Sequence, residues 1–213
     1  THVSLYNWGE PLLHPELSKI ISHLHENGIA AAVSTHLSIV TGGQIRKVIK
    51  AAPEYLKISL SGYYPNEYDV THAGGDINLV KSNLYRIRYF IDQFKSNTLV
   101  DVNYHLYTNN NGKNLKKMQE LCDELDFSLS TVNSLVMPVE RVIDYVEGKD
   151  EARTSELNKI LPVTIEEGIS VASDFKLDSC PFMDNQININ YDMSVPVCCT
   201  VFDQTDTIVQ KNY

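Results

Sequence analysis

Short apolar runs alternate with amphipathic helical segments over residues 1–135, and this alternation limits the folds open to the chain. The apolar runs predict five strands, at residues 3–6, 29–34, 55–60, 98–106 and 127–132. The gap between each pair of strands has room for a helix, which is what a parallel strand connection needs. The pattern therefore predicts an α/β fold with a parallel sheet or barrel.

Local signals place the helices between these strands. Residues 17–24 carry apolar side chains at helical spacing. Thr41 and Asp76 can act as N-caps of the next two helices, because their side-chain oxygens can accept a backbone N–H. A fourth helix is predicted at 115–125, and residues 61–75 are predicted to form a loop.

Charge and hydropathy exclude two classes of partner. The chain has 27 acidic and 18 basic residues and a formal net charge of −9. Binding to nucleic acid depends on Lys and Arg that neutralise phosphates, and no basic stripe is present. No apolar run reaches the roughly 18 residues that a membrane span needs. We therefore expect neither a nucleic-acid nor a membrane partner.

The start of the chain and its cysteines indicate whether it is part of a longer protein and in which cellular compartment it is expected. The chain starts at Thr1 with a strand pattern and without a signal-peptide pattern, so we interpret it as a piece of a longer protein. Its four cysteines do not form a dense disulfide framework. We expect a cytoplasmic protein.

Polar residues and glycines follow the predicted strands at their carboxyl ends, where parallel βα folds carry their sites. The candidates are Gly9, Glu10, Pro11, Thr35, His36, Ser59, Ser61, His72, Asn103 and His105. This set suits a small zwitterionic molecule: carbonyls and Glu10 can meet an ammonium, and hydroxyls can meet a carboxylate or a ribose. The alternative is that Gly9-Glu10-Pro11 is an ordinary turn, and that the serines satisfy nearby backbone groups.

Several of these residues resemble motifs of radical S-adenosylmethionine (SAM) proteins. Residues 8–15, Trp-Gly-Glu-Pro-Leu-Leu-His-Pro, resemble the GGEP-type motif that ends the second barrel strand of that family. Thr35-His36 stands where the family has a Thr-Asn-like pair. Ser59, Ser61 and Gly74-Gly75-Asp76 match a Ser-containing strand end and the helix start that follows it. Three residues depart from the pattern: Trp8 replaces a Gly, His36 an Asn, and His72 an Arg.

The resemblance implies a fold, a chemistry and roles for residues. The fold would be a partial (β/α)6 TIM-like barrel of parallel strands with a small Cys-containing C-terminal extension. A [4Fe–4S] cluster would cleave SAM reductively to give a 5′-deoxyadenosyl radical that modifies a peptide, a sugar or another metabolite, with a flavodoxin or ferredoxin as electron donor. The resemblance assigns Gly9, Glu10 and Pro11 to the SAM amino group; Ser59, Ser61 and His72 to its carboxylate and ribose; and Thr35, His36, Asn103 and His105 to the pocket lining.

The family's CxxxCxxC cluster motif does not occur in the sequence. In the family it follows the first barrel strand, so the resemblance implies that this chain starts at the second strand and that the catalytic cluster ligands lie outside it. On its own, the chain is then expected to be inactive.

The C-terminal cysteines form a second resemblance. The spacing of Cys180 and Cys198, followed by Cys199, resembles the start of a SPASM-type domain, which holds an auxiliary [4Fe–4S] cluster. Met193 occupies the position where that pattern has a glycine. Two unpaired thiols or an incomplete zinc knuckle are the alternatives. Cys122, within a helix pattern, is predicted to be core.

The sequence predicts three regions: a partial radical SAM barrel at 1–135, a helical linker at 136–175 and a truncated SPASM-like region at 176–213. Helices are predicted at 138–148 and 153–168, and short strands at 186–190 and 195–199. Two other functions stay open. One is a non-catalytic barrel that serves as a binding or scaffold module, which His72 and Trp8 motivate. The other is an unrelated βα-barrel lyase that binds phosphate at helix N-termini.

Overall fold

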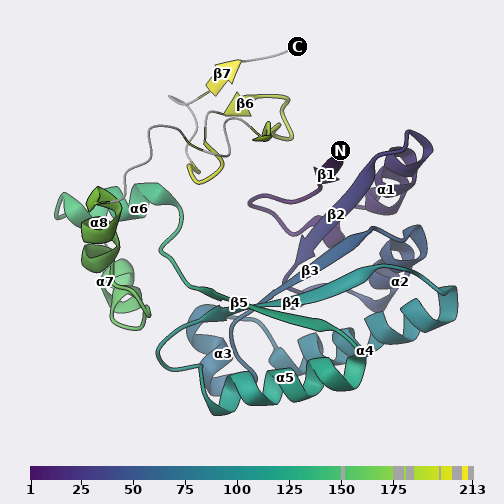
Figure 1. Ribbon diagram of the computed structural model, residues 1–213, viewed down its shortest axis with the longest axis horizontal. Coiled ribbons are helices and arrows are strands. Elements are labelled where there is room, and N and C mark those ends of the chain that lie inside the picture. The colour runs from purple at the N-terminus through teal and green to yellow at the C-terminus, as the bar shows by residue number, and fades with distance from the viewer. Residues whose placement is uncertain (150–151, 175–179, 181–184, 197, 203–207, 211–213) are drawn as a thin grey trace. The chain divides into compact units, whose positions relative to one another are not determined.

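The computed structural model describes residues 1–149, 152–174, 180, 185–196, 198–202 and 208–210 (Figure 1). The chain divides into two compact units, Thr1–Asn133 and Ser134–Tyr213.

The first unit is built on one parallel sheet. Its strands are β1 (His2–Ser4), β2 (Ala30–Thr35), β3 (Tyr55–Leu60), β4 (Leu99–Leu106) and β5 (Ser128–Asn133). They pair in sequence order, and all four pairings are parallel. The structure confirms the predicted α/β class with parallel strands and is consistent with a partial TIM-like barrel.

The connecting helices lie on the same face of this sheet, as right-handed crossovers between sequential strands require (Figure 1). They are η1 (Pro11–Leu13), α1 (Leu17–Glu26), α2 (Gly42–Ala51), α3 (Pro65–Thr71), α4 (Ile77–Phe94) and α5 (Lys113–Leu125). The predicted caps are present: the Thr41 side chain accepts from the backbone N–H of Gln44, and Asp76 accepts from that of Asn78. Each cap satisfies a helix N–H that has no partner within the helix.

Helix α3 corrects the prediction of a loop over residues 61–75. Pro65 occupies the first turn of this helix, where its missing N–H costs nothing. Tyr68 is the buried residue of the helix. A single anchoring side chain gives too little periodicity to predict a helix of 7 residues from sequence.

Alternation along the central strands separates an apolar face from a polar face. In β3, Leu56, Ile58 and Leu60 are buried in the core that the helices cover. The alternate residues Tyr55, Lys57 and Ser59 are half-buried and face the opposite side, because successive side chains of a strand alternate. This open face is polar, whereas the interior of a complete TIM barrel is dominated by Val, Ile and Leu.

Cys122 of α5 lies in the apolar core, as predicted. Cys122 is 1% exposed. Burial raises the pKa of the Cys122 thiol to about 12, with the nearby carboxylates of Asp123 and Asp101 acting in the same direction. The thiol is therefore a neutral packing group.

The second unit contains helices α6 (Val139–Val146), α7 (Ala152–Asn158) and α8 (Ile165–Asp174). The prediction of one helix over 153–168 is wrong, because α7 and α8 are separated by a segment that includes Pro162. Asn158 joins them: its Oδ1 accepts from the backbone N–H of Ile165 at 2.8 Å, and its Nδ2 donates to Glu166 at 3.0 Å.

Strands β6 (Val195–Pro196) and β7 (Ile208–Gln210) pair antiparallel in this unit. The predicted strand at 186–190 is absent, so that prediction is wrong. A turn over residues 190–194 follows this segment. The backbone N–H of Asn190 donates to the Ser194 carbonyl at 2.9 Å, and the Asp192 side chain accepts from Ser194 N–H at 3.0 Å. These local hydrogen bonds form the turn, and residues 186–190 before it make no strand pairing. No helix in the described part of the chain is long and apolar enough to cross a membrane.

Candidate functional site at the carboxyl edge of the sheet

Glu10 links the turn after β1 to the end of β2. Its Oε1 accepts from the backbone N–H of Leu12 at 3.0 Å and caps η1. Its Oε2 accepts from Thr35 Oγ1 at 2.8 Å and from the backbone N–H of His36 at 3.0 Å. The Glu10 side chain is only 4% exposed. The carboxylate therefore fixes the geometry of two neighbouring strand ends, and its oxygens are already engaged by the protein's own donors.

The His36 ring closes the same corner. Its Nδ1 accepts from Ser38 N–H at 3.2 Å and lies 2.6 Å from Ser38 Oγ. Its Nε2 lies 3.3 Å from Glu10 Oε2. Both ring nitrogens of His36 therefore already have partners within the protein. His36 thus orients the loop while remaining partly exposed at the edge.

A pair of hydroxyls bridges β2 and β3 at the next position. Ser34 Oγ and Ser59 Oγ are 3.4 Å apart, and both side chains are half-buried. Each hydroxyl can donate one hydrogen and accept others. The pair therefore has hydrogen-bonding capacity left for a ligand above the strand ends.

His72 lies in a tight polar and aromatic contact. Its Nδ1 lies 2.8 Å from Ser61 Oγ and 3.1 Å from Thr71 Oγ1. Its ring stacks on Tyr68, with centroids 4.4 Å apart and an interplanar angle of 10°. Burial lowers the pKa of His72 to about 4, and His105 and His36 add to this effect. At neutral pH this side chain supplies a neutral hydrogen-bonding group and no positive charge.

Two residues of β4 belong to a directional hydrogen-bond chain. His105 Nε2 lies 3.1 Å from Asn103 Oδ1, which can only accept. Asn103 Nδ2 donates to Ser130 Oγ at 2.9 Å, and Ser130 Oγ donates to Asp101 Oδ2 at 2.7 Å. The proton of neutral His105 is therefore on Nε2. Burial lowers the pKa of His105, and the charge of Lys57 lowers it further.

Asn110 holds the ends of β3 and β4 together. Its Nδ2 donates to the carbonyls of Ser61 and His105, both at 2.8 Å. Its Oδ1 accepts from the backbone N–H of Tyr107 at 2.8 Å, and the side chain is 1% exposed. This amide fixes the spacing between two of the predicted site residues.

The structure brings the predicted residues of the first unit to one edge in four hydrogen-bonded groups. The groups are Glu10 with Thr35 and His36, Ser59 with Ser34, Ser61 with His72, and Asn103 with His105. Gly9 is exposed in the turn before Glu10, and Pro11 opens η1. The roles of all these residues toward SAM remain predictions.

Sequence reasoning missed Thr71 and Asn110, which support these groups. For Tyr68 it favoured packing over a place at the mouth of the pocket, and the ring is buried and stacked on His72. Gly75 is a sequence signal for the close packing at Tyr68. A Cβ on Gly75 would lie 2.9 Å from Tyr68 Cε1, so a glycine is needed there to make room for the stacked rings. No local signal marks Asn110, because its partners are strand ends.

The predicted metal ligands lie in the second unit. Cys180 is exposed, and Cys198 and Cys199 are partly buried. Cys198 Sγ lies 3.0 Å from Thr200 Oγ1. Among the described residues, no three His, Cys, Asp or Glu side chains are grouped so that they could hold a metal ion. The assignment of these thiols to a cluster stays a prediction.

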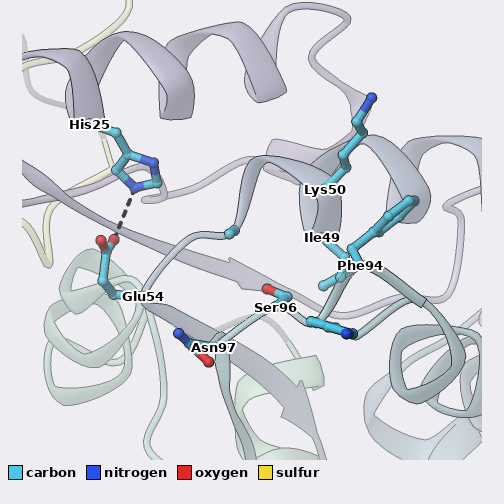
Figure 2. A pocket seen from close by; sticks show the side chains of 9 residues that line it. His25, Ile49, Lys50, Glu54, Phe94, Ser96 and Asn97 are labelled. Atoms are coloured by element: carbon cyan, nitrogen blue, oxygen red, sulfur yellow. Dashed lines mark hydrogen bonds and ion pairs between the residues drawn. The ribbon is translucent and has the colours of Figure 1, made fainter. Parts of the chain in front are cut away.

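A hollow of about 350 Å³ lies at the opposite, amino end of the strands (Figure 2). His25 and Glu54 face each other there, with Nε2 and Oε2 3.1 Å apart. Glu54 Oε2 also accepts from the backbone N–H of Ala31 at 2.8 Å. These bonds lower the pKa of Glu54 against the opposing effect of its partial burial. Since the carboxylate joins the starts of two strands, we interpret this hollow as structural.

Comparison with solved structures places the fold. A domain of pyruvate-formate lyase-activating enzyme from Bacteroides vulgatus ATCC 8482 is similar, with a TM-score of 0.51 and 22% identity over 84% of this chain and 97% of that domain. Archaeal TYW1 is similar with a TM-score of 0.47 and 21% identity; the matched region is 70% of this chain but only 50% of TYW1. The Escherichia coli coproporphyrinogen III oxidase HemN, a radical SAM enzyme, gives a TM-score of 0.49 and 12% identity over 82% of this chain and 40% of HemN.

No protein-family model matches the sequence, and no curated protein matches it. The chain thus shares its fold with the activating-enzyme domain, which it spans almost completely, and it spans about half the length of TYW1.

The donor set of the edge fits the polar groups of a small ligand such as SAM. The Ser34 and Ser59 hydroxyls and the neutral His105 ring can exchange hydrogen bonds with hydroxyl, amino and carboxylate groups. The space around Gly9 is open, since a Cβ there would meet nothing within 4 Å. The edge is therefore suited to binding and orienting a polar molecule.

Proposed function

We propose that this chain is part of a radical SAM enzyme and forms one side of its SAM-binding barrel. One observation carries the proposal. The Gly9-Glu10-Pro11 turn, which resembles the family motif, is held by Glu10 against the end of β2, beside the Ser34–Ser59 pair. The similarity of the fold to an activating-enzyme domain supports it.

When bound, a [4Fe–4S] cluster and SAM would supply a 5′-deoxyadenosyl radical that attacks the substrate, and the cluster ligands would lie outside this chain. The chain's own residues would bind and orient SAM. In this proposal, the backbone of Gly9 faces the amino group, and Glu10 keeps that backbone in place through its bonds to Thr35 and His36.

Ser59 and the neutral imidazole of His105 are proposed to meet the carboxylate and ribose. His72 is proposed to support Ser61 and the loop after α3, because its ring is stacked and its pKa of about 4 leaves it uncharged. A neutral imidazole holds a carboxylate less firmly than the guanidinium fork of Arg. We therefore propose that SAM binds here with fewer charged contacts than the family pattern provides.

The substrate class is a peptide, a sugar or another metabolite, and the second unit would start a SPASM-like region with an auxiliary [4Fe–4S] cluster on Cys180, Cys198 and Cys199. We propose a flavodoxin or ferredoxin as the electron donor and the cytoplasm as the location.

The experiment uses the longer gene product that contains this chain, purified and reconstituted with iron and sulfide under anaerobic conditions. Formation of 5′-deoxyadenosine from SAM after reduction is measured by chromatography. We expect cleavage in the wild type and none in a triple Cys→Ala variant of an upstream CxxxCxxC motif. Cleavage that survives the triple substitution contradicts the proposal.

A Glu10→Gln variant tests the part played by this chain. Glutamine keeps one acceptor oxygen but has to give up bonds among the three donors that now meet Glu10. We expect weaker SAM binding at an unchanged iron content, and we expect a matched Glu16→Gln variant, whose side chain is on the surface of the same region, to bind normally.

A second candidate is a non-catalytic barrel that acts as a binding or scaffold module. The neutral, stacked state of His72 favours it, because the usual charged contact is then missing. The same experiment separates the two functions. A gene product with no upstream CxxxCxxC motif and no SAM cleavage supports the scaffold.

A further inference from the structure

A continuous line of hydrogen bonds crosses the open face of the sheet and ends at His105. Tyr55 Oη donates to Asp101 Oδ2 at 2.7 Å, and Ser130 Oγ donates to the same oxygen at 2.7 Å. Asn103 Nδ2 donates to Ser130 Oγ at 2.9 Å, and Asn103 Oδ1 lies 3.1 Å from His105 Nε2. These five residues are called the Tyr55–His105 chain below.

The parallel register of the strands brings these side chains together. Asn103 of β4 is paired with Ser130 of β5. Asp101 and His105 lie two residues before and two residues after Asn103 in β4, so the three side chains point to the same face. Tyr55 of β3 and Ser130 of β5 add one hydroxyl each from the neighbouring strands. The Tyr55–His105 chain therefore runs along β4 toward the carboxyl edge of the sheet.

The direction of each hydrogen bond follows from the Asp101 end of the chain. Burial raises the pKa of Tyr55, and the bond to Asp101 adds to this effect, so the phenol keeps its proton and donates it. Ser130 Oγ has one hydrogen and gives it to Asp101 Oδ2. Ser130 Oγ must therefore accept from Asn103, which turns the amide nitrogen toward Ser130 and the amide oxygen toward His105. An amide oxygen only accepts, so the hydrogen of the His105 ring lies on Nε2.

The second ring nitrogen of His105 is left for a ligand. Within the described part of the chain, no group donates a hydrogen bond to Nδ1, and the side chain is half-buried near the end of β4. Burial lowers the pKa of His105, so the ring is neutral at neutral pH and Nδ1 carries a lone pair. Such a nitrogen accepts from a hydroxyl or an ammonium group, whereas a carboxylate has no hydrogen to offer it.

We propose that Asp101, Ser130 and Asn103 are positioning residues that hold Nδ1 of His105 as a fixed acceptor for a hydroxyl or ammonium group of the bound molecule. The identity of that molecule, SAM or the substrate, rests on the proposed radical SAM function. Of the SAM groups proposed above for Ser59 and His105, this acceptor can meet the ribose hydroxyls, and the carboxylate is left to Ser59. A ring held in place by the protein also loses less freedom when the ligand binds.

The first measurement is NMR of the ring nitrogens of the 7 histidines in the 213-residue chain. It is made at about pH 8, where an ordinary histidine is neutral. A His105→Gln variant assigns the His105 signals by their loss. We expect a hydrogen on Nε2 that exchanges slowly with water, and an Nδ1 without a hydrogen. A hydrogen on Nδ1 in the wild type overturns the proposal, and this result depends on the folding of no positioning variant.

Two substitutions of Ser130 test the positioning role. Ser130→Ala removes the hydroxyl that orients the Asn103 amide, so the Nε2 hydrogen of His105 should exchange with water about two- to tenfold faster, the range expected for one net hydrogen bond. Ser130→Thr keeps a hydroxyl and should keep the slow exchange. Ser128→Ala is the matched control, because Ser128 is exposed on the same face of β5. Unchanged exchange in a folded Ser130→Ala variant overturns the proposal.

The second measurement is the affinity of the reconstituted longer gene product, without reductant, for SAM and for a SAM analogue that lacks the 2′- and 3′-hydroxyl groups. If the ribose supplies the donor, Ser130→Ala should weaken the binding of SAM by about two- to tenfold and leave the binding of the analogue unchanged. Equal binding of both molecules to the wild type instead assigns the donor to the substrate. Equal weakening of both by Ser130→Ala overturns the acceptor role, because the loss does not then involve a hydroxyl.

The NMR measurement needs neither SAM nor a cluster. A failure of SAM cleavage in the longer gene product therefore leaves the position of the His105 hydrogen standing as a result. A hydrogen found on Nδ1 overturns the acceptor role and leaves the proposed function standing.

Discussion

His72 should make the free energy of unfolding depend on pH. Its pKa lies at about 4 in the folded chain against an ordinary value of 6.5, mainly because of burial. Below pH 6.5 the unfolded chain therefore takes up a proton that the folded chain refuses. Stability is highest above that pH and falls as the pH drops toward 4. At about 1.4 kcal/mol per pH unit, the loss between pH 7 and 5 is about 2 kcal/mol and the full loss is about 3 kcal/mol.

The assay is urea unfolding of the wild type and of His72→Gln between about pH 7 and 5, where few carboxylates titrate. Glutamine can still bond to Ser61 but does not titrate. The wild type should lose about 2 kcal/mol more than the variant over this range. His23→Gln is the matched control, because the His23 side chain is 75% exposed. Equal pH slopes for the wild type and His72→Gln would refute the reasoning, whatever the absolute stability of the variant.

Three further outcomes follow from packing and hydrogen bonds. Thr35→Val removes one of the two donors to the buried Glu10 Oε2 and leaves the buried backbone N–H of Leu37 without its acceptor, so urea unfolding should show a loss of about 1–3 kcal/mol. Gly75→Ala forces a contact of 2.9 Å and should lower the thermal midpoint, whereas Gly9→Ala, which meets nothing within 4 Å, should change it little. Asp101→Asn removes the charge that helps to raise the pKa of Tyr55, so a spectrophotometric titration should show that tyrosine ionising at lower pH; an unchanged titration would contradict the hydrogen bond between them.

The fold could be predicted because its signals are local. Strand β3 has the predicted bounds, and β2 and β4 differ from prediction by a residue at their ends. Thr41 and Asp76 cap their helices as expected, since a cap depends only on residues a turn away. Helix α3 was missed because its buried residue, Tyr68, belongs to the core cluster that other elements build, and a single buried position gives no helical periodicity.

The site could be predicted in its position but not in its bonding. The topology of a parallel sheet brings strand ends to one edge, so the candidates were found together. The commitment of the Glu10 carboxylate to Thr35 joins residues 25 positions apart, and no local pattern encodes it. The depressed pKa of His72 likewise comes from burial and from His105 and His36, which belong to other elements.

Asn110 fixes the distance between the ends of β3 and β4 at the carboxyl edge of the sheet. One amide nitrogen, Nδ2, donates to the carbonyls of both Ser61 and His105 at 2.8 Å, so the two carbonyl oxygens have to stay within reach of a single atom. Ser61, His105 and their neighbours can then be exchanged during evolution without altering the spacing of the frame that carries them. The ligand that such an edge prefers can therefore change through substitutions, while the spacing of the strand ends that bind it stays the same.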